Sequence, residues 1–273
     1  MAEAPFSRRH GYSGQAQEIT IREDAPESLR AFVLSRAEHL GLRPDPFRDI
    51  TCLVLEERPD LSNWSAYPNI WGEVQRHVYN CAWFQVYDII EAIWAHFHRE
   101  DEQSYEDAKA PAFEKELNDF FVRKGIGWKL EKGQIMTRGG EAFEMAVKTT
   151  VEELEATGRP TAKKEIHKAL LALSKRPEPD LRDAVIHAAG CLECVARDVA
   201  GDKKATLGEI IKKQPGLVPR PLDTAIEKMW GYASNEARHV VEGQQPGREE
   251  AELMVGIAAT MATYLSKKAD DRT

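Results

Sequence analysis

Apolar residues recur every three or four positions through most of the first hundred residues, which is the spacing of one face of an α-helix. This spacing predicts helices after Pro26, over residues 47–55, after Pro68 and over residues 83–97. The last of these has the strongest apolar stripe, formed by Phe84, Tyr87, Ile90, Ile93, Trp94 and Phe97. A short strand is predicted at residues 19–21. We expect residues 1–99 to form a small helical N-terminal domain.

In the middle of the chain, residues 100–175, the spacing between apolar residues changes twice. Polar and charged residues dominate positions 99–109 and predict a linker, and a helix follows around residues 113–121. Apolar residues then alternate on both sides of the polar segment 131–134, which predicts a β-hairpin within residues 125–138. Two connecting helices are expected after the hairpin, over residues 141–157 and 160–175.

The last part, residues 176–273, is predicted to be helical, with clear signals for where helices start and end. Helices are expected over residues 183–199, 222–233 and 248–268, and Thr206 with Glu209 forms the pattern of a capping box. Short connections between such helices favour an antiparallel bundle. The predicted fold class is therefore mainly α, with a small helical N-terminal domain, a helix–β-hairpin middle segment and a C-terminal antiparallel helical bundle.

Composition narrows the class of protein. The 273 residues are 42% hydrophobic and 30% charged, which is typical of an ordinary globular chain. The formal net charge of -8 excludes a globally basic nucleic-acid coat, although a local basic cleft stays open. No apolar run approaches the length of about 18 residues that a membrane span needs, and residues 1–12 do not form a secretory signal. Four cysteines do not make a disulfide framework, so the cytoplasm is the expected location.

The helix predicted over residues 183–199 has two different faces. Its apolar face holds Val185, Ala189, Leu192, Ala196 and Val199, and the opposite face holds His187, Cys191, Cys194 and Asp198. Such a polar face is typical of one covered by a partner chain or a ligand, and the alternative is a partly buried histidine with two inert thiols. The Cys-x-x-Cys pair lies mid-helix, which disfavours redox catalysis, and zinc would need two further ligands. No metal and no cofactor is therefore expected.

A second cluster follows Trp230 and Tyr232 at the end of the next long helix, where Asn235 precedes the adjacent pair Arg238 and His239. Histidine exchanges protons near neutral pH, and arginine offers a forked cation that matches phosphate oxygens. Together these side chains suit metal-free RNA cleavage by internal transesterification. No P-loop, nucleophile elbow, zinc-protease or dinucleotide-binding motif occurs in the sequence.

Several longer sequence segments resemble those of a known family. The N-terminal part resembles the N-terminal domain of AbiJ-type abortive-infection proteins in Phe6-Ser7-Arg8-Arg9-His10-Gly11-Tyr12, Asn63-Trp64-Ser65, Tyr67-Pro68-Asn69-Ile70-Trp71 and Val86-Tyr87-Asp88-Ile89-Ile90-Glu91. The C-terminal part resembles the abortive-infection C-terminal, HEPN-like domains in Arg176-Pro177-Glu178-Pro179-Asp180, Leu192-Glu193-Cys194-Val195-Ala196-Arg197, Trp230-Gly231-Tyr232-Ala233-Ser234 and Arg238-His239.

This resemblance implies a HEPN bundle that dimerises and places arginine and histidine in a shared cleft. Many HEPN proteins are metal-independent ribonucleases of phage defence or of toxin–antitoxin pairs. Their usual signature separates the arginine from the histidine by four to six residues, whereas Arg238 and His239 are adjacent here and no arginine lies four to seven positions before His239. Either Arg197 or Arg238 fills the arginine role from a different position, or the site is degenerate and the bundle binds without catalysis.

The resulting hypothesis is an antiphage effector that cleaves RNA as a homodimer or a higher homo-oligomer, with an antitoxin or a phage-derived trigger as further partners and no membrane. His239 is the expected acid–base group and Arg238 the phosphate clamp, with His187 and Glu193 assisting in catalysis. The expected RNA contacts are Arg197, Trp230, Tyr232 and Asn235. The alternative is a catalytically inactive HEPN-like module that binds RNA or a protein. A third hypothesis is a metal hydrolase using Asp183, His187 and His239.

Overall fold

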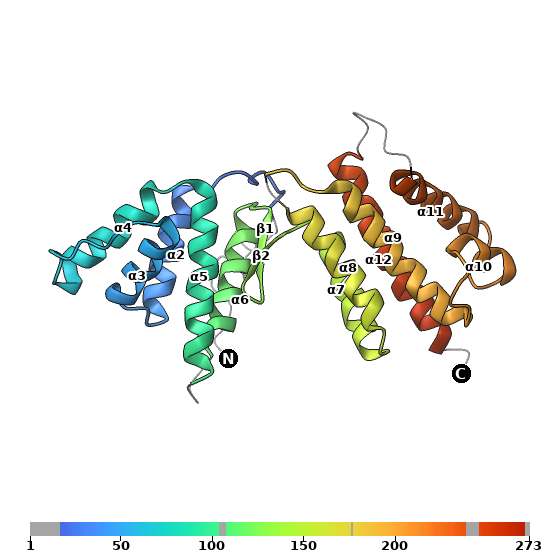
Figure 1. Cartoon of the computed structure of the whole chain (residues 1–273), viewed down its shortest axis with the longest axis horizontal. Helices are drawn as coiled ribbons and strands as arrows, with labels where there is room; N and C mark the ends of the chain where they lie inside the picture. The colour runs from blue at the N-terminus through green and yellow to red at the C-terminus, as the bar shows by residue number, and fades with distance from the viewer. Residues whose placement is uncertain (1–16, 104–107, 176, 239–245, 271–273) are drawn as a thin grey trace, which may run out of the picture. The chain divides into compact units, whose positions relative to one another are not determined.

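The computed structural model describes residues 17–103, 108–175, 177–238 and 246–270 (Figure 1). The chain forms two compact units, Met1–Arg138 and Gly139–Thr273. Helices dominate both units, and the two strands of the described chain form one antiparallel pair. The prediction of a mainly α fold is therefore confirmed. None of the described helices combines the length and the apolar character that crossing a membrane requires.

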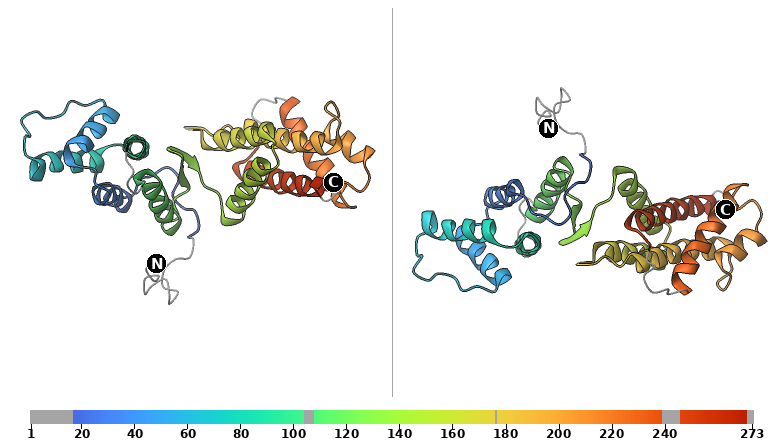
Figure 2. Two further views of the ribbon diagram at one scale, coloured as in Figure 1. Left: turned by 90° about the horizontal axis from the view of Figure 1, so that it is seen from below. Right: turned by 90° about the horizontal axis from the view of Figure 1, so that it is seen from above.

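The N-terminal unit consists of helices around one long central helix (Figure 2). Its elements are α2 (Glu27–His39), α3 (Pro44–Leu55), the short η1 (Ala66–Ile70), α4 (Trp71–Asn80), α5 (Trp83–Asp101), α6 (Lys109–Arg123), β1 (Trp128–Glu131) and β2 (Gln134–Thr137). All four helices that the apolar spacing predicted before residue 99 are present. The helix expected at residue 47 begins three residues earlier, at Pro44, because proline suits the first helical position.

The core of this unit is built from buried aliphatic and aromatic side chains of its helices and hairpin, with an aromatic contact between α5 and α6. Phe97 of α5 meets Phe113 of α6 edge-on, with ring centroids 5.7 Å apart, and both side chains are fully buried. The predicted hairpin is present, with Trp128 opposite Thr137 and Leu130 opposite Ile135. The strand expected at residues 19–21 is reduced to one isolated parallel bridge between Ile21 and Ile126.

The C-terminal unit is a helical bundle. Its elements are α7 (Glu141–Ala156), α8 (Pro160–Ser174), α9 (Leu181–Ala200), α10 (Leu207–Lys213), α11 (Leu222–Arg238) and α12 (Arg248–Asp270). Helix α9 packs against α8, α11 and α12, and α7 packs against α8 and α12. Every helix predicted in this region is present, and the capping box joins Thr206 and Glu209 at the start of α10.

The bundle is larger than the sequence pattern indicated, because α7 and α8 belong to it as well. Thr150 of α7 donates a hydrogen bond to the carbonyl of Ala259 in α12 at 2.8 Å, and its hydroxyl lies 2.9 Å from that of Thr263. Ile166 and Leu173 of α8 are completely buried in the same unit. The predicted middle segment is thus shared, since α6 and the hairpin pack with the N-terminal unit. The division into segments 1–99, 100–175 and 176–273 stays a prediction.

Candidate functional site

Helix α9 is the centre of the candidate site, and burial extends further around it than a helical wheel predicts. Val185, Leu192 and Ala196 are buried as expected. Cys191, from the supposed polar face, is buried too, because α8 covers that part of the face. A Cβ placed on Gly190 would lie 3.5 Å from the Glu165 carboxylate of α8. Helix α8 of the same chain therefore covers Cys191 and part of the polar face of α9, whereas Asp198 on that face is 61% exposed.

His187 makes the closest contact across the α8–α9 interface. Its Nδ1 atom lies 2.7 Å from Oε2 of Glu165, and Lys168 donates to Oε1 of the same carboxylate at 2.7 Å. Burial raises the pKa of Glu165, but the hydrogen bonds from Lys168 and His187 outweigh it and hold that pKa below its usual value. Because Nδ1 faces Glu165, Nε2 is the nitrogen that can exchange a proton with a substrate. Glu165 was not among the predicted site residues.

The two thiols of α9 are poorly suited to chemistry. Burial raises the pKa of Cys191 to about 12. Burial and the nearby Glu165 carboxylate also raise the pKa of Cys194. A thiol with a raised pKa carries little of the thiolate that acts as nucleophile. Both cysteines therefore behave as the inert packing residues of the alternative interpretation.

Arg197 lies towards the other end of α9 and has protein partners. Its Nη2 atom is 3.2 Å from the Glu193 carboxylate one turn earlier, and its Nε atom donates to the carbonyl of Ala205 at 2.8 Å. Ten residues separate Arg197 from His187, which is about 15 Å along a helix. Within one chain, Arg197 and His187 therefore do not meet in a single site.

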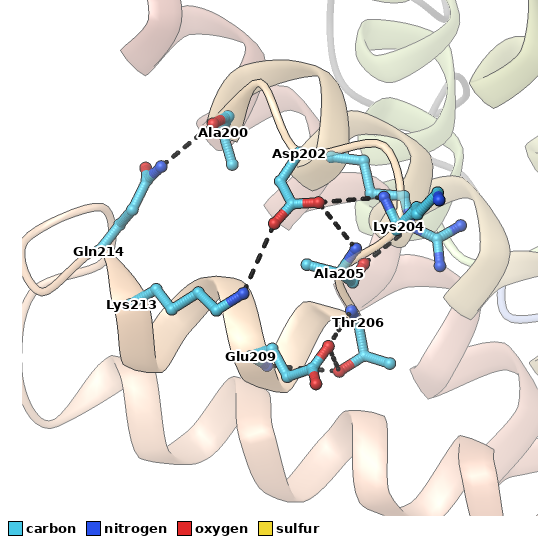
Figure 3. Close-up of polar contacts among 9 residues, drawn as sticks. Ala200, Asp202, Lys204, Ala205, Thr206, Glu209, Lys213 and Gln214 are labelled. Atoms are coloured by element: carbon cyan, nitrogen blue, oxygen red, sulfur yellow. Dashed lines mark hydrogen bonds and ion pairs between the residues drawn. The ribbon is translucent and has the colours of Figure 1, made fainter.

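The connection that Arg197 contacts, between α9 and α10, is held by its own polar network (Figure 3). The Asp202 carboxylate accepts hydrogen bonds from the backbone of Lys204 and Ala205, both at 3.1 Å, and pairs with Lys213 at 3.6 Å. Gln214 donates to the carbonyl of Ala200 at 3.2 Å. These contacts fix the loop whose carbonyl the arginine binds, so Arg197 has a structural task in addition to any contact with RNA.

An open cavity of about 350 Å³ lies beside Arg197, between α9 and the start of α8. Arg159 and Lys203 also line this cavity, and Arg159 pairs with Asp198 at 2.8 Å. Three cationic side chains and the N-terminus of α8, which carries partial positive charge, border this cavity, and the Asp198 carboxylate in the same lining offsets part of that charge. Arg159 and Lys203 were not among the predicted site residues; Arg159 directly precedes α8, and Lys203 lies three residues after the end of α9.

Helix α11 carries the remaining predicted residues. Trp230 and Tyr232 are half-buried. Asn235 and Arg238 belong to the last turns of the helix, and His239 lies outside the described residues. Figure 1 shows α11 antiparallel to α9, so the end of α11 and the start of α9 lie at the same end of the unit. The backbone of Arg238 is therefore on the His187 side of the bundle, away from Arg197.

These observations define a two-unit helical protein with a partly buried histidine–glutamate contact, His187 with Glu165, in its C-terminal bundle. The chain matches the family model AbiJ N-terminal domain 4 over residues 4–153, which is more than half of its length. The chain therefore belongs to the AbiJ N-terminal domain 4 family, and this membership indicates a role in abortive infection, a form of defence. No curated protein and no solved structure matches the chain.

Proposed function

We propose that the protein is an antiphage abortive-infection effector whose C-terminal bundle is a metal-independent, HEPN-type endoribonuclease acting as a dimer. The observation that carries this proposal is the 2.7 Å contact between His187 and Glu165. A carboxylate that holds one imidazole nitrogen orients the other for proton transfer, as in many acid–base sites. Arg238 is the last residue of α11, which packs against α9, the helix that carries His187.

In the proposed reaction, a histidine removes the proton of a ribose 2′-hydroxyl, and the oxygen attacks the adjacent phosphorus. The bond from phosphorus to the 5′-oxygen breaks, and a second group protonates that oxygen as it leaves. The products are a 2′,3′-cyclic phosphate and a free 5′-hydroxyl. His239 and His187 supply the two proton-handling groups, Glu165 orients His187, and Arg238 stabilises the charge on the phosphate.

Arg197 takes a different role in this proposal from the one that the sequence suggested. Its distance of about 15 Å from His187 along α9 separates it from the reacting phosphate. Together with Arg159 and Lys203 it instead contacts a neighbouring phosphate of the RNA chain in the cavity beside α8. Glu193 holds the Arg197 guanidinium in place rather than transferring protons. Trp230, Tyr232 and Asn235 stay proposed RNA contacts.

The proposed dimer needs a surface other than the polar face of α9, which α8 covers in part. Helices α7 and α12 border an apolar groove of about 410 Å³, lined among others by Phe143, Leu253 and Ile257. Leu253 is 60% exposed and Met145 on α7 is 63% exposed. Exposed apolar patches of this kind favour association with another protein surface, and a second copy of the bundle would bury this one.

The second candidate function is a catalytically inactive module that binds RNA or a protein. The adjacency of Arg238 and His239 favours it, because the family signature separates these residues. The cationic cavity also favours it, since phosphate binding there requires no proton transfer. The metal-hydrolase hypothesis differs from both functions in requiring a metal ion, so EDTA separates it from the proposed nuclease.

The test is cleavage of single-stranded RNA by the purified full-length protein in EDTA. We expect products with 2′,3′-cyclic phosphate ends, and we expect His239→Ala and His187→Ala each to reduce the rate by about 100-fold or more. Glu165→Gln should reduce the rate less than His187→Ala, because it removes the orienting charge but keeps the imidazole. The matched control is His167→Ala, which removes an exposed histidine from α8 beside Glu165.

Three results would contradict the nuclease. Cleavage by His239→Ala at the wild-type rate would remove its central residue, and activity lost in EDTA would favour the metal hydrolase. RNA binding without cleavage, by a protein that light scattering shows to be a stable dimer, would select the inactive binding module.

A further inference from the structure

A second cluster of reactive side chains lies in the N-terminal unit, far along the sequence from the proposed nuclease residues. Cys52 of α3 meets Glu73 and His77 of α4, and one ligand atom from each lies within 4.8 Å of the others. The Sγ atom of Cys52 is 3.9 Å from Nδ1 of His77. Cys52 is 3% exposed and Glu73 is 2% exposed. A thiol, a carboxylate and an imidazole therefore converge, and the first two are almost fully buried.

The outer atoms of this cluster have partners that suit a metal site. The other ring nitrogen of His77, Nε2, lies 3.3 Å from the Glu57 carboxylate. The two oxygens of Glu73 accept hydrogen bonds from the backbone N–H of Asp60 at 2.8 Å and from the Asn63 side chain at 2.9 Å. Metal-binding histidines commonly pair their second nitrogen with a carboxylate, and metal-binding carboxylates are themselves hydrogen-bonded.

We propose that Cys52, Glu73 and His77 bind one zinc-class divalent ion in the N-terminal unit. Sulfur, nitrogen and carboxylate oxygen form a typical ligand set for Zn²⁺. Bond lengths of about 2.3 Å to sulfur and about 2.0 Å to nitrogen place tetrahedral ligands roughly 3.5 Å apart, so the Sγ–Nδ1 distance needs only a small contraction. The bound ion joins α3 to α4 and to the Glu57–Asn63 loop.

The fourth coordination position is open to solvent. A polar cavity of about 510 Å³ lies directly beside the cluster, and Glu57, Glu73 and His77 all line it. Three protein ligands with a water in the fourth position are the arrangement of zinc sites that can exchange ligands, whereas purely structural sites use four protein ligands. The ion is therefore reachable from solution, and a water molecule from the cavity completes its shell.

The three proposed ligands come from two helices and include one cysteine only, so the spacing between cysteines does not reveal them. Glu73 and His77 are four residues apart and share one face of α4, but Cys52 comes from the preceding helix. The expectation of no metal rested on the spacing between cysteines, and this ligand set contains only one cysteine. The zinc site is independent of the proposed nuclease, which needs none of these three residues.

The test uses the full-length protein, freed of any affinity tag, stripped with a chelator and titrated with Zn²⁺ or Co²⁺. We expect one Zn²⁺ per chain by calorimetry and elemental analysis. The Co²⁺ form should show tetrahedral d–d bands and a thiolate-to-cobalt absorption in the near ultraviolet. Cys52→Ser should abolish that absorption, and His77→Ala should abolish stoichiometric binding. The matched control is Cys81→Ser, because the Cys81 thiol bonds to Val78 and Arg30 instead.

A variant outside the ligand set guards against simple misfolding. Glu57→Gln changes a carboxylate that is 58% exposed, so we expect it to fold normally and to weaken Zn²⁺ binding by about 10- to 100-fold. Absence of stoichiometric binding to the wild-type protein would overturn the proposal. Binding that Cys52→Ser, His77→Ala and Glu57→Gln all leave unchanged would overturn it as well, because the ion would then occupy another place.

Discussion

At the scale of single residues, Glu165 is the side chain on which the C-terminal site depends. It is only 20% exposed, yet it stays ionised because Lys168 and His187 both contact it. Its pKa is lowered, so the folded state binds this proton less tightly than the unfolded state. Its contribution to stability is therefore fully present above the unfolded pKa of about 4.3 and is lost as the pH falls through the lower folded value.

The lowered pKa of Glu165 gives a prediction about how stability depends on pH. Glu165→Gln should lower the free energy of unfolding at pH 6.5, and the difference from wild type should shrink at pH 4. Urea unfolding at both pH values measures it. The matched control is Glu152→Gln, which removes an exposed carboxylate that pairs with Lys148 at 3.9 Å and should have a small effect. A difference for Glu165→Gln that grows towards pH 4 would contradict this account.

The same residue shows where prediction from sequence ends. Helical periodicity placed Val185 and Leu192 on the buried face of α9 and His187 on another, and the structure agrees. Periodicity describes one helix at a time, so it could not show that α8 would bring Glu165 onto His187, 22 positions away. Cys52 and His77 likewise lie on two different helices, 25 positions apart, so the pattern of either helix could not predict their contact. Contacts between helices depend on how the two helices pack against each other. The apolar pattern of a single helix does not contain that information.

At the scale of elements, the sequence was sufficient to predict a helix end where residues at that end stabilise it. The capping box at α10 is the clearest case. The Glu209 backbone N–H donates to Oγ1 of Thr206 at 3.4 Å, and the Thr206 N–H donates to Glu209 Oε2 at 2.8 Å. The start of α3 lies three residues before the predicted one for a local reason as well, because Pro44 occupies the first helical position, which proline suits.

Helix α10 has seven residues and therefore depends strongly on its cap. Thr206→Ala should destabilise the C-terminal unit by about 1 kcal/mol, because it leaves the Glu209 N–H without its side-chain acceptor. The shift in urea midpoint measures this effect. Thr260→Ala is the control, since that hydroxyl is exposed and only donates to the carbonyl one turn back in α12. Equal shifts for the two variants would show that the cap contributes nothing.

At the scale of the whole molecule, each unit has a core of its own. Phe97 is fully buried at the centre of the N-terminal unit, and Phe97→Ala should cost about 3–5 kcal/mol there. Hydrogen exchange followed by mass spectrometry should show faster exchange in α5 and α6, with little change in α8 and α9. The control is Phe84→Ala, an exposed residue of the same helix. Equal acceleration in both units would show that they unfold as one.

The net charge of the whole molecule limits how the proposed RNA substrate could bind. With a net charge of -8, the protein surface as a whole repels a polyanion, so attraction has to come from a local group of cations. The cavity bordered by Arg159, Arg197 and Lys203 supplies such a group in the C-terminal unit. Few phosphates can be neutralised there, so binding should weaken only moderately as salt is added.

Helix α7 has a consequence for how such proteins diversify. The stretch that matches the AbiJ family model ends at residue 153, inside α7, while the packing of the chain divides at Arg138. The inherited module therefore includes most of a helix whose Thr150 is bonded to Ala259 in the last helix of the chain. A recombination event at the inherited boundary would separate that threonine from its partner. Any other C-terminal domain joined at residue 153 would therefore have to supply a new partner for the face of α7 that Thr150 presents to Ala259 here.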